Sequence, residues 1–111
     1  MIMENLTLSI KFTSKAENSA AFKKVLHELF NTINSEDNFI NATIHEGLGK
    51  PEEFLVYETW NDNIEHFLAV QMKKPYAVAF EQTLVDMAIK REPFAYTPFA
   101  YFGTHLIEEV K

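Results

Sequence analysis

The stretch Phe54-Leu-Val-Tyr-Glu-Thr-Trp60, with Asn61-Asp-Asn63 directly after it, decides the fold of this chain. Its first part is rich in β-branched and aromatic residues, which favours a strand. The polar residues that follow can accept hydrogen bonds from the free N–H groups at the start of a helix. The sequence therefore predicts a strand that leads directly into a helix.

The two faces of this strand carry different side chains, because alternate residues of a strand point to opposite sides of its sheet. One face carries Phe54, Val56, Glu58 and Trp60, and the other carries Leu55, Tyr57 and Thr59. Bulky apolar groups lie on both faces. We therefore expect a central strand that is covered on both sides.

The chain before this stretch is predicted to form a strand, a helix and a second strand. Residues 6–12 and 39–46 alternate between apolar and polar side chains, which predicts the two strands. Thr13 or Ser14 is the expected cap of the helix between them, and the polar cluster 34–38 is expected to end it. The apolar stripe of this helix comprises Phe22, Val25, Leu26, Leu29, Phe30 and Ile33.

A short connection joins the second predicted strand to the decisive stretch. It contains Gly47, Gly49 and Pro51. Glycine adopts positive φ at little cost, so the chain can turn tightly here. The strands on either side are therefore expected to pair as an antiparallel hairpin.

The chain after Asn63 is predicted to hold a broken helix. Helical spacing begins at Ile64 and is interrupted at Lys73-Lys74-Pro75. Proline lacks an amide donor but suits the first turn of a helix, so a new helix is predicted from Pro75 to about Lys90. Its apolar stripe comprises Tyr76, Phe80, Leu84 and Met87, widened by Val78, Val85 and Ile89.

The aromatic segment 94–102 favours an edge strand, or a strand broken at Pro98, because proline cannot donate to a strand ladder. Two alternatives stay open for the tail 103–111, which either extends this strand or forms a short terminal arm.

The predicted order is strand, helix, strand, strand, broken helix, strand. This is the split βαβ arrangement of ferredoxin-like domains, an α+β fold with helices on one face of an antiparallel sheet. We expect residues 1–111 to form one domain of this kind. The other face of the sheet carries apolar as well as polar groups, so we expect a homodimer in which two sheets face each other.

Composition excludes several classes of function. The formal net charge of −6 opposes binding to a phosphate backbone, so a nucleic-acid partner is not expected. The absence of cysteine excludes disulfides and thiolate chemistry and is compatible with a reducing cytoplasm. No apolar run approaches the roughly 20 residues of a membrane span. We therefore expect a soluble cytoplasmic protein without a membrane partner.

Several short motifs follow the hairpin. They are Tyr57-Glu-Thr-Trp60 at the end of the strand, Asp62 as the acidic cap of the next helix, His66 on that helix, and Lys74-Pro-Tyr-x-x-x-Phe80 at the start of the following one. Together they resemble the motifs of the antibiotic biosynthesis monooxygenase superfamily. The resemblance extends from the first strand to the last.

The resemblance implies a dimeric α+β barrel with a pocket between the sheet and the helices of each subunit. Characterised members include haem-degrading enzymes and cofactor-independent monooxygenases that convert phenolic or quinol substrates into quinones. It therefore implies a monooxygenase that uses O2 without a cofactor and acts on a phenolic, quinol or polyketide-like small molecule.

The chain departs from the family pattern at two points. Relatives often place a histidine nine residues after the tryptophan, where this chain has Ala69; its own histidine is His66. Haem-degrading members need an asparagine on the first strand, where this chain offers Thr7 and Ser9, and a tryptophan on the second helix, which it lacks. Haem degradation is therefore disfavoured.

Oxygenation without a metal or flavin requires a base that removes a phenolic proton inside a dry pocket. Histidine suits this role because its ordinary pKa lies near neutrality. The predicted catalytic residues are His66 and His45. Aromatic rings can stack on a flat substrate, and Tyr57 or Glu58 can hold it by a hydrogen bond. The predicted substrate-binding residues are Tyr57, Glu58, Trp60, Tyr76 and Phe80.

Each residue also has a structural interpretation. His66 and His45 suit solvated positions, and Trp60 and Tyr76 suit a core or a pocket wall. Glu58 is flanked by apolar groups, so it must find a partner or stay protonated; a structural hydrogen bond is the alternative to a functional role. The histidines lack metal-ligand spacing such as His-Glu-x-x-His, so no metal is expected.

A second class of function stays open. Because a fold does not fix a function, a non-catalytic dimeric barrel that binds a small apolar ligand, or that acts in a stress response, is the alternative to an enzyme.

Overall fold

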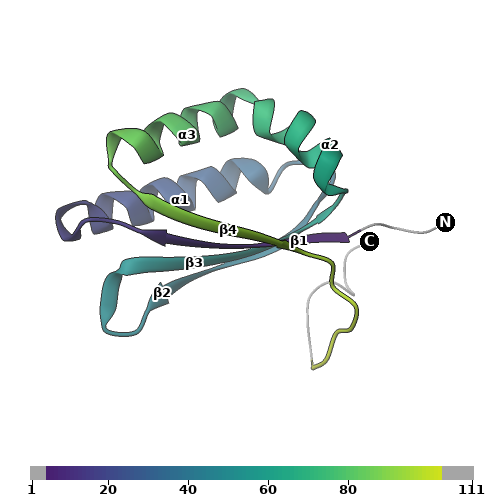
Figure 1. Ribbon diagram of the computed structural model, residues 1–111, viewed down its shortest axis with the longest axis horizontal. Coiled ribbons are helices and arrows are strands. Elements are labelled where there is room, and N and C mark those ends of the chain that lie inside the picture. The colour runs from purple at the N-terminus through teal and green to yellow at the C-terminus, as the bar shows by residue number, and fades with distance from the viewer. Residues whose placement is uncertain (1–4, 104–111) are drawn as a thin grey trace.

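The structure, a computed structural model, describes residues 5–103 and places an antiparallel sheet against a layer of helices (Figure 1). The strands are β1 (Asn5–Thr13), β2 (Phe39–Gly47), β3 (Lys50–Asn61) and β4 (Lys90–Tyr96), in the order β2-β3-β1-β4. The helices are α1 (Ser19–Ile33), α2 (Ile64–Ala69) and α3 (Pro75–Asp86), with 3-10 turns η1 (Ala16–Asn18) and η2 (Gln71–Lys73). The predicted α+β ferredoxin-like fold is confirmed.

β3 is an inner strand, as predicted, and its register decides which side chains meet the helices. Glu58 lies between Leu8 of β1 and Ala42 of β2, and Trp60 lies opposite Leu6 of β1. The helix-facing side of β3 is buried at Phe54, Val56, Glu58 and Trp60. The predicted division of this strand into two faces therefore holds.

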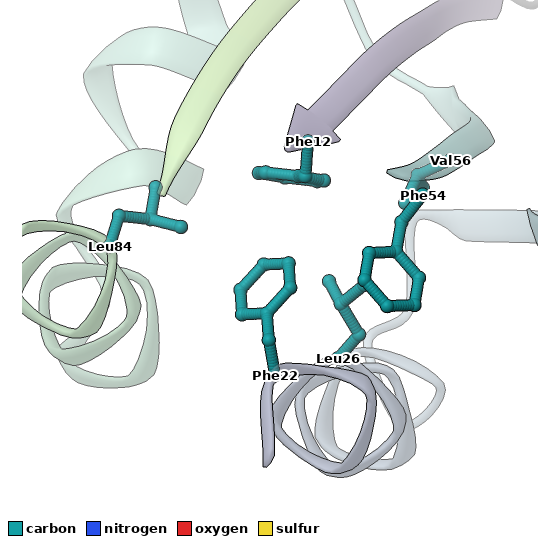
Figure 2. Packing of buried hydrophobic residues seen from close by; sticks show 6 residues of the cluster. All are labelled: Phe12, Phe22, Leu26, Phe54, Val56 and Leu84. Carbon is teal, nitrogen blue, oxygen red and sulfur yellow. The ribbon is translucent and has the colours of Figure 1, made fainter. Parts of the chain in front are cut away.

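The core lies between the sheet and the helices in two clusters. One joins β1, β3, α1 and α3. Figure 2 shows its Phe22 ring below its Phe12 ring. The two rings pack edge-to-face with centroids 5.4 Å apart. Its buried members are Phe12, Phe22, Leu26, Phe54, Val56 and Leu84. The second cluster lies at the other end of the sheet and contains Leu6, Leu8, Ile33, Trp60 and Phe67.

The predicted polar residues 61–63 lead into α2, and the predicted break before Pro75 is present, although α2 already ends at Ala69. Asn63 precedes α2, and its side-chain oxygen accepts a hydrogen bond from the His66 N–H at 2.8 Å. After α2, η2 leads to Lys74, whose backbone is extended, and Pro75 is the first residue of α3. The predicted hairpin is also present, with Gly49 at φ 70° in its turn. Pro51, assigned to the connection from sequence, already lies in β3.

The start of α1 differs from the prediction. Thr13 still pairs with Glu53 in the sheet, and the Ser14 N–H donates to the Glu52 carbonyl at 2.9 Å. Neither residue therefore caps the helix. The intervening 3-10 turn moves the start of α1 to Ser19, and Asn18 takes the capping position.

The end of α3 and the last strand also differ from the prediction. α3 ends at Asp86 because Ala88 turns the chain at φ 54°, and the Ile89 N–H then bonds to the Leu84 carbonyl at 2.8 Å. β4 therefore begins at Lys90 and ends before Pro98. Within the predicted stripe of α3, Val78 and Val85 are exposed to solvent.

Within residues 5–103, no helix covers the second face of the sheet (Figure 1). We expected both faces of β3 to be covered. Among the described residues, the helices cover one of these faces. The alternatives for the tail concern residues 104–111, which lie outside the described residues. Over residues 5–103, no helix has the length and apolar character needed to cross a membrane.

Phe22 tests the core, because its side chain is 0% exposed and contacts rings from both β1 and β3. Phe22→Ala should lower the free energy of unfolding by about 3–5 kcal/mol, since it leaves a cavity among aromatic side chains. The matched control is Phe99→Ala, because Phe99 is 98% exposed. The free energy of unfolding of this variant should stay within about 0.5 kcal/mol of the wild-type value. Denaturant unfolding measures both. Equal losses would contradict the assigned core.

Candidate functional site

A cavity of about 380 Å³ lies between the sheet and the helices. This volume falls in the range of small-molecule sites, about 300–1,000 Å³. Most of its wall is apolar, and the polar side chains that line it are Glu58, Gln71, Tyr76 and Arg91. The apolar wall includes Leu8 and Ile10 of β1, Leu29, Phe30 and Ile33 of α1, Trp60 of β3, Ile64, Phe67 and Leu68 of α2, and Met72.

Glu58 is the buried carboxyl of this cavity. The alternation of β3 places it on the helix-facing side between Val56 and Trp60, and only 6% of it is exposed. The Trp60 Nε1–H donates a hydrogen bond to its Oε1 at 2.7 Å. Burial raises the pKa of Glu58 to about 7, against the smaller opposing effect of this hydrogen bond. The carboxyl can therefore exchange a proton near neutral pH.

Trp60 forms a rigid part of the wall next to this carboxyl. Its buried indole packs edge-to-face on Phe39 of β2 and on Phe67 of α2, each with ring centroids 5.2 Å apart. Because these rings come from three different elements, they hold the indole in one orientation. That orientation aims its N–H at Glu58.

Tyr76 lines the cavity from α3, and a polar network at the edge of the cavity holds its hydroxyl. The Tyr76 O–H donates to Glu36 Oε2 at 2.6 Å, and Lys74 Nζ donates to Glu36 Oε1 at 2.6 Å. Gln71 Nε2 donates to the Tyr76 hydroxyl oxygen and, at 3.3 Å, to Glu36. The hydrogen bond from Lys74, followed by that from Tyr76, lowers the pKa of Glu36.

The pKa of the Tyr76 phenol is raised, first by burial and then by the hydrogen bond to Glu36. Tyr76 therefore stays neutral at physiological pH. Its ring is a wall of the cavity, and its hydroxyl fastens α3 to the turn between α1 and β2.

The two predicted catalytic histidines lie outside the cavity. His66 is exposed on α2, and its Nδ1 is 2.8 Å from Asp62 Oδ1. His45 lies on the opposite face of the sheet, where its ring is 6.1 Å from that of Tyr57. The cavity wall does not include either ring. Their catalytic role stays a prediction, and the arrangement of the cavity gives it no support.

The structure divides the predicted substrate-binding residues into three groups. Glu58, Trp60 and Tyr76 meet at the cavity. Phe80 packs in the neighbouring core cluster, with its ring 5.8 Å from that of Phe12. Tyr57 lies on the uncovered face of the sheet.

Sequence reasoning missed two polar residues of the wall. Gln71 is buried at the break between α2 and α3. The Lys-Lys-Pro sequence predicted this break but did not indicate that a nearby polar side chain would be buried. Arg91 lies in β4, in a segment predicted to follow the end of a helix, and its guanidinium is paired with Glu81, with Nη2 2.9 Å from Oε1. Within residues 5–103, no cluster of three or more acidic or histidine side chains could hold a metal ion.

Comparison with known proteins adds three findings. The sequence model of the antibiotic biosynthesis monooxygenase family matches residues 5–85. Solved structures share the fold. SnoaB from Streptomyces nogalater, a cofactor-independent oxygenase, has a TM-score of 0.77 at 16% identity over 91% of this chain and 99% of its own. PA3566 from Pseudomonas aeruginosa has a TM-score of 0.77 at 17% identity, over 90% of this chain and 99% of its own. No curated protein matches the sequence.

The pKa of Glu58 predicts how stability depends on pH. Folding raises this pKa from an ordinary value of 4.5 to about 7. The folded state therefore binds more protons between these values, so the contribution of Glu58 to stability is present below pH 4.5 and is lost as pH rises through about 7. Glu58→Gln stays neutral and should exceed wild type in stability at pH 8, by on the order of 3 kcal/mol.

Urea unfolding from pH 5 to pH 8 measures this difference. The matched control is Glu65→Gln on an exposed position of α2, which should keep the pH dependence of wild type. A Glu58→Gln protein whose stability follows the wild-type curve at every pH would show that the carboxyl is not buried in the folded state.

Proposed function

Because the chain belongs to the antibiotic biosynthesis monooxygenase family, we propose that it is a cofactor-independent monooxygenase that oxidises a phenolic, quinol or polyketide-like small molecule with O2. The observation that carries this proposal is a mainly apolar cavity with a proton-exchanging carboxyl inside it. SnoaB, which has the same fold, is a cofactor-independent oxygenase, and this supports the same reaction class.

The reaction balances with O2 as the only co-reactant. A phenol that carries a ring hydrogen para to its hydroxyl gives a para-quinone and water. One oxygen atom enters the ring carbon, and the ring hydrogen and the hydroxyl hydrogen leave with the other oxygen atom as water. The substrate supplies all the electrons, which is why an electron-rich anion is needed.

The cavity favours such a substrate in shape and polarity. Trp60 and Tyr76 present ring surfaces to it, and the apolar side chains of α1 and α2 exclude water from the remaining wall. Exposed Ile64 and Leu68 also line it, so the cavity reaches the surface beside α2. A flat aromatic molecule can enter there with its hydroxyl directed at Glu58.

Ala77 tests whether the cavity is the reaction site, because this small residue of α3 lines it. Ala77→Phe should fill the cavity and lower oxygen uptake with quinols and polycyclic phenols by about tenfold or more, equivalent to at least 1.4 kcal/mol. Ala79→Phe, on an exposed position of the same helix, is the control and should leave uptake unchanged.

Oxygen uptake is measured with an oxygen electrode in the presence of a chelator. Equal activity of the two variants would place the reaction elsewhere. Absence of uptake by the folded wild-type protein, together with binding of the same phenols, would favour the non-catalytic ligand-binding barrel.

We also propose that the protein is a homodimer that joins two copies through their uncovered sheet faces. Leu55, Tyr57, Phe94 and Tyr96 are exposed apolar or aromatic side chains of β3 and β4. The register places Tyr57 and Phe94 on either side of Ser9, and Tyr96 next to Thr7. Exposed aromatic and apolar side chains gathered on one sheet face are usually buried against a partner, and two-fold dimers are the commonest solution.

Tyr57, which is 51% exposed, tests the dimer. Light scattering should give twice the chain mass of 12.9 kDa for wild type and the single chain mass for Tyr57→Lys, because a charge at the centre of an apolar interface is left unpaired. Val85→Lys, on an exposed position of α3, should stay dimeric. A wild-type mass of one chain at micromolar concentration would contradict the dimer.

A further inference from the structure

We propose that Glu58 is the general base of this site and that its free carboxylate oxygen takes the hydroxyl proton of a phenol or enol bound in the cavity. This inference rests on the proposed function. It assigns the proton transfer to Glu58 in place of the predicted bases His66 and His45.

The hydrogen bonding of Glu58 leaves one oxygen for a ligand. The hydrogen bond from Trp60 ends on Oε1. None of the hydrogen bonds found among residues 5–103 ends on Oε2, and Glu58 is part of the cavity wall. Because Trp60 can only donate, it orients the carboxylate without competing for the proton.

The other ionisable groups that face the cavity cannot accept this proton. Tyr76 of α3 stays a neutral phenol and donates a hydrogen bond to Glu36. Arg91 of β4 stays cationic in its ion pair with Glu81. The faces of α1 and α2 that line the cavity are apolar. Among the described residues, Glu58 is therefore the one side chain of the wall that can act as a base.

The titration of Glu58 suits the step. A base is most effective when its pKa lies near the working pH, and burial brings that of Glu58 to about 7. The substrate O–H bond breaks, an O–H bond forms on Glu58, and the electron pair stays on the substrate oxygen. The resulting phenolate is the electron-rich anion that reacts with O2. Glu58 then gives this proton to the oxygen atom that leaves as water, together with the ring hydrogen, and is ready for the next substrate.

The test uses 4-nitrophenol, a flat phenol whose pKa is close to neutrality and whose anion absorbs visible light. The absorption spectrum of the bound probe at pH 7 is recorded for wild type, Glu58→Gln, His66→Ala and His45→Ala. In wild type the pKa of Glu58 is close to that of the probe, so the proton should lie on each of them for a comparable fraction of the time. The bound probe should therefore be about as ionised as the free probe.

In Glu58→Gln the bound probe should contain at least about tenfold less phenolate than in wild type, because burial alone disfavours the anion. Both histidine variants should retain the wild-type spectrum. Far-UV circular dichroism checks that each variant is folded. The wild-type spectrum is also a test in its own right. Burial disfavours the anion, so without a base in the cavity the bound probe should be less ionised than the free probe.

Three results would overturn the assignment. Bound probe that is neutral in wild type would show that Glu58 does not accept the proton, although the cavity would still bind phenols. Loss of the phenolate spectrum in a histidine variant would transfer the role to that histidine. Absence of binding to any of these proteins would overturn the proposed phenol site itself, and the base assignment with it.

Discussion

The hydrogen bond from Trp60 to Glu58 is the interaction on which the rest of the site depends. Both residues lie on the helix-facing side of β3, where a carboxyl must find a donor or remain protonated. One hydrogen bond satisfies one oxygen and leaves the other exposed to the cavity. The indole that donates it is itself fixed by two flanking rings. Core packing and site chemistry therefore share one strand face.

The interruption between α2 and α3 gives the cavity its outer wall. Pro75 starts α3 in a new direction, and the preceding turn buries Gln71 beside Tyr76. The network through Glu36 then ties both residues to the turn after α1. A continuous helix from residue 64 onward could not place these groups at the same point. The break is thus part of how the site is built.

Sequence periodicity predicted the fold because its strongest signals were local. The two faces of β3, the polar cap within residues 61–63 and the break before Pro75 all follow from side chains within a few residues. The end of α3 was missed because Met87 and Ile89 continue an apolar pattern across a turn made by Ala88. The site was harder still. Periodicity assigned His45 to a face but could not show that this face lies away from the cavity.

Trp60 is the chain's only tryptophan, and this gives the protein an internal optical reporter. Indole emission responds to charge and to aromatic molecules close to the ring. Here the fluorophore touches the titrating carboxyl and lines the cavity at the same time. Its emission therefore reports, without a label, both the charge state of Glu58 and the arrival of a ligand. Compounds can be screened directly on the unmodified protein, before any reaction product is known.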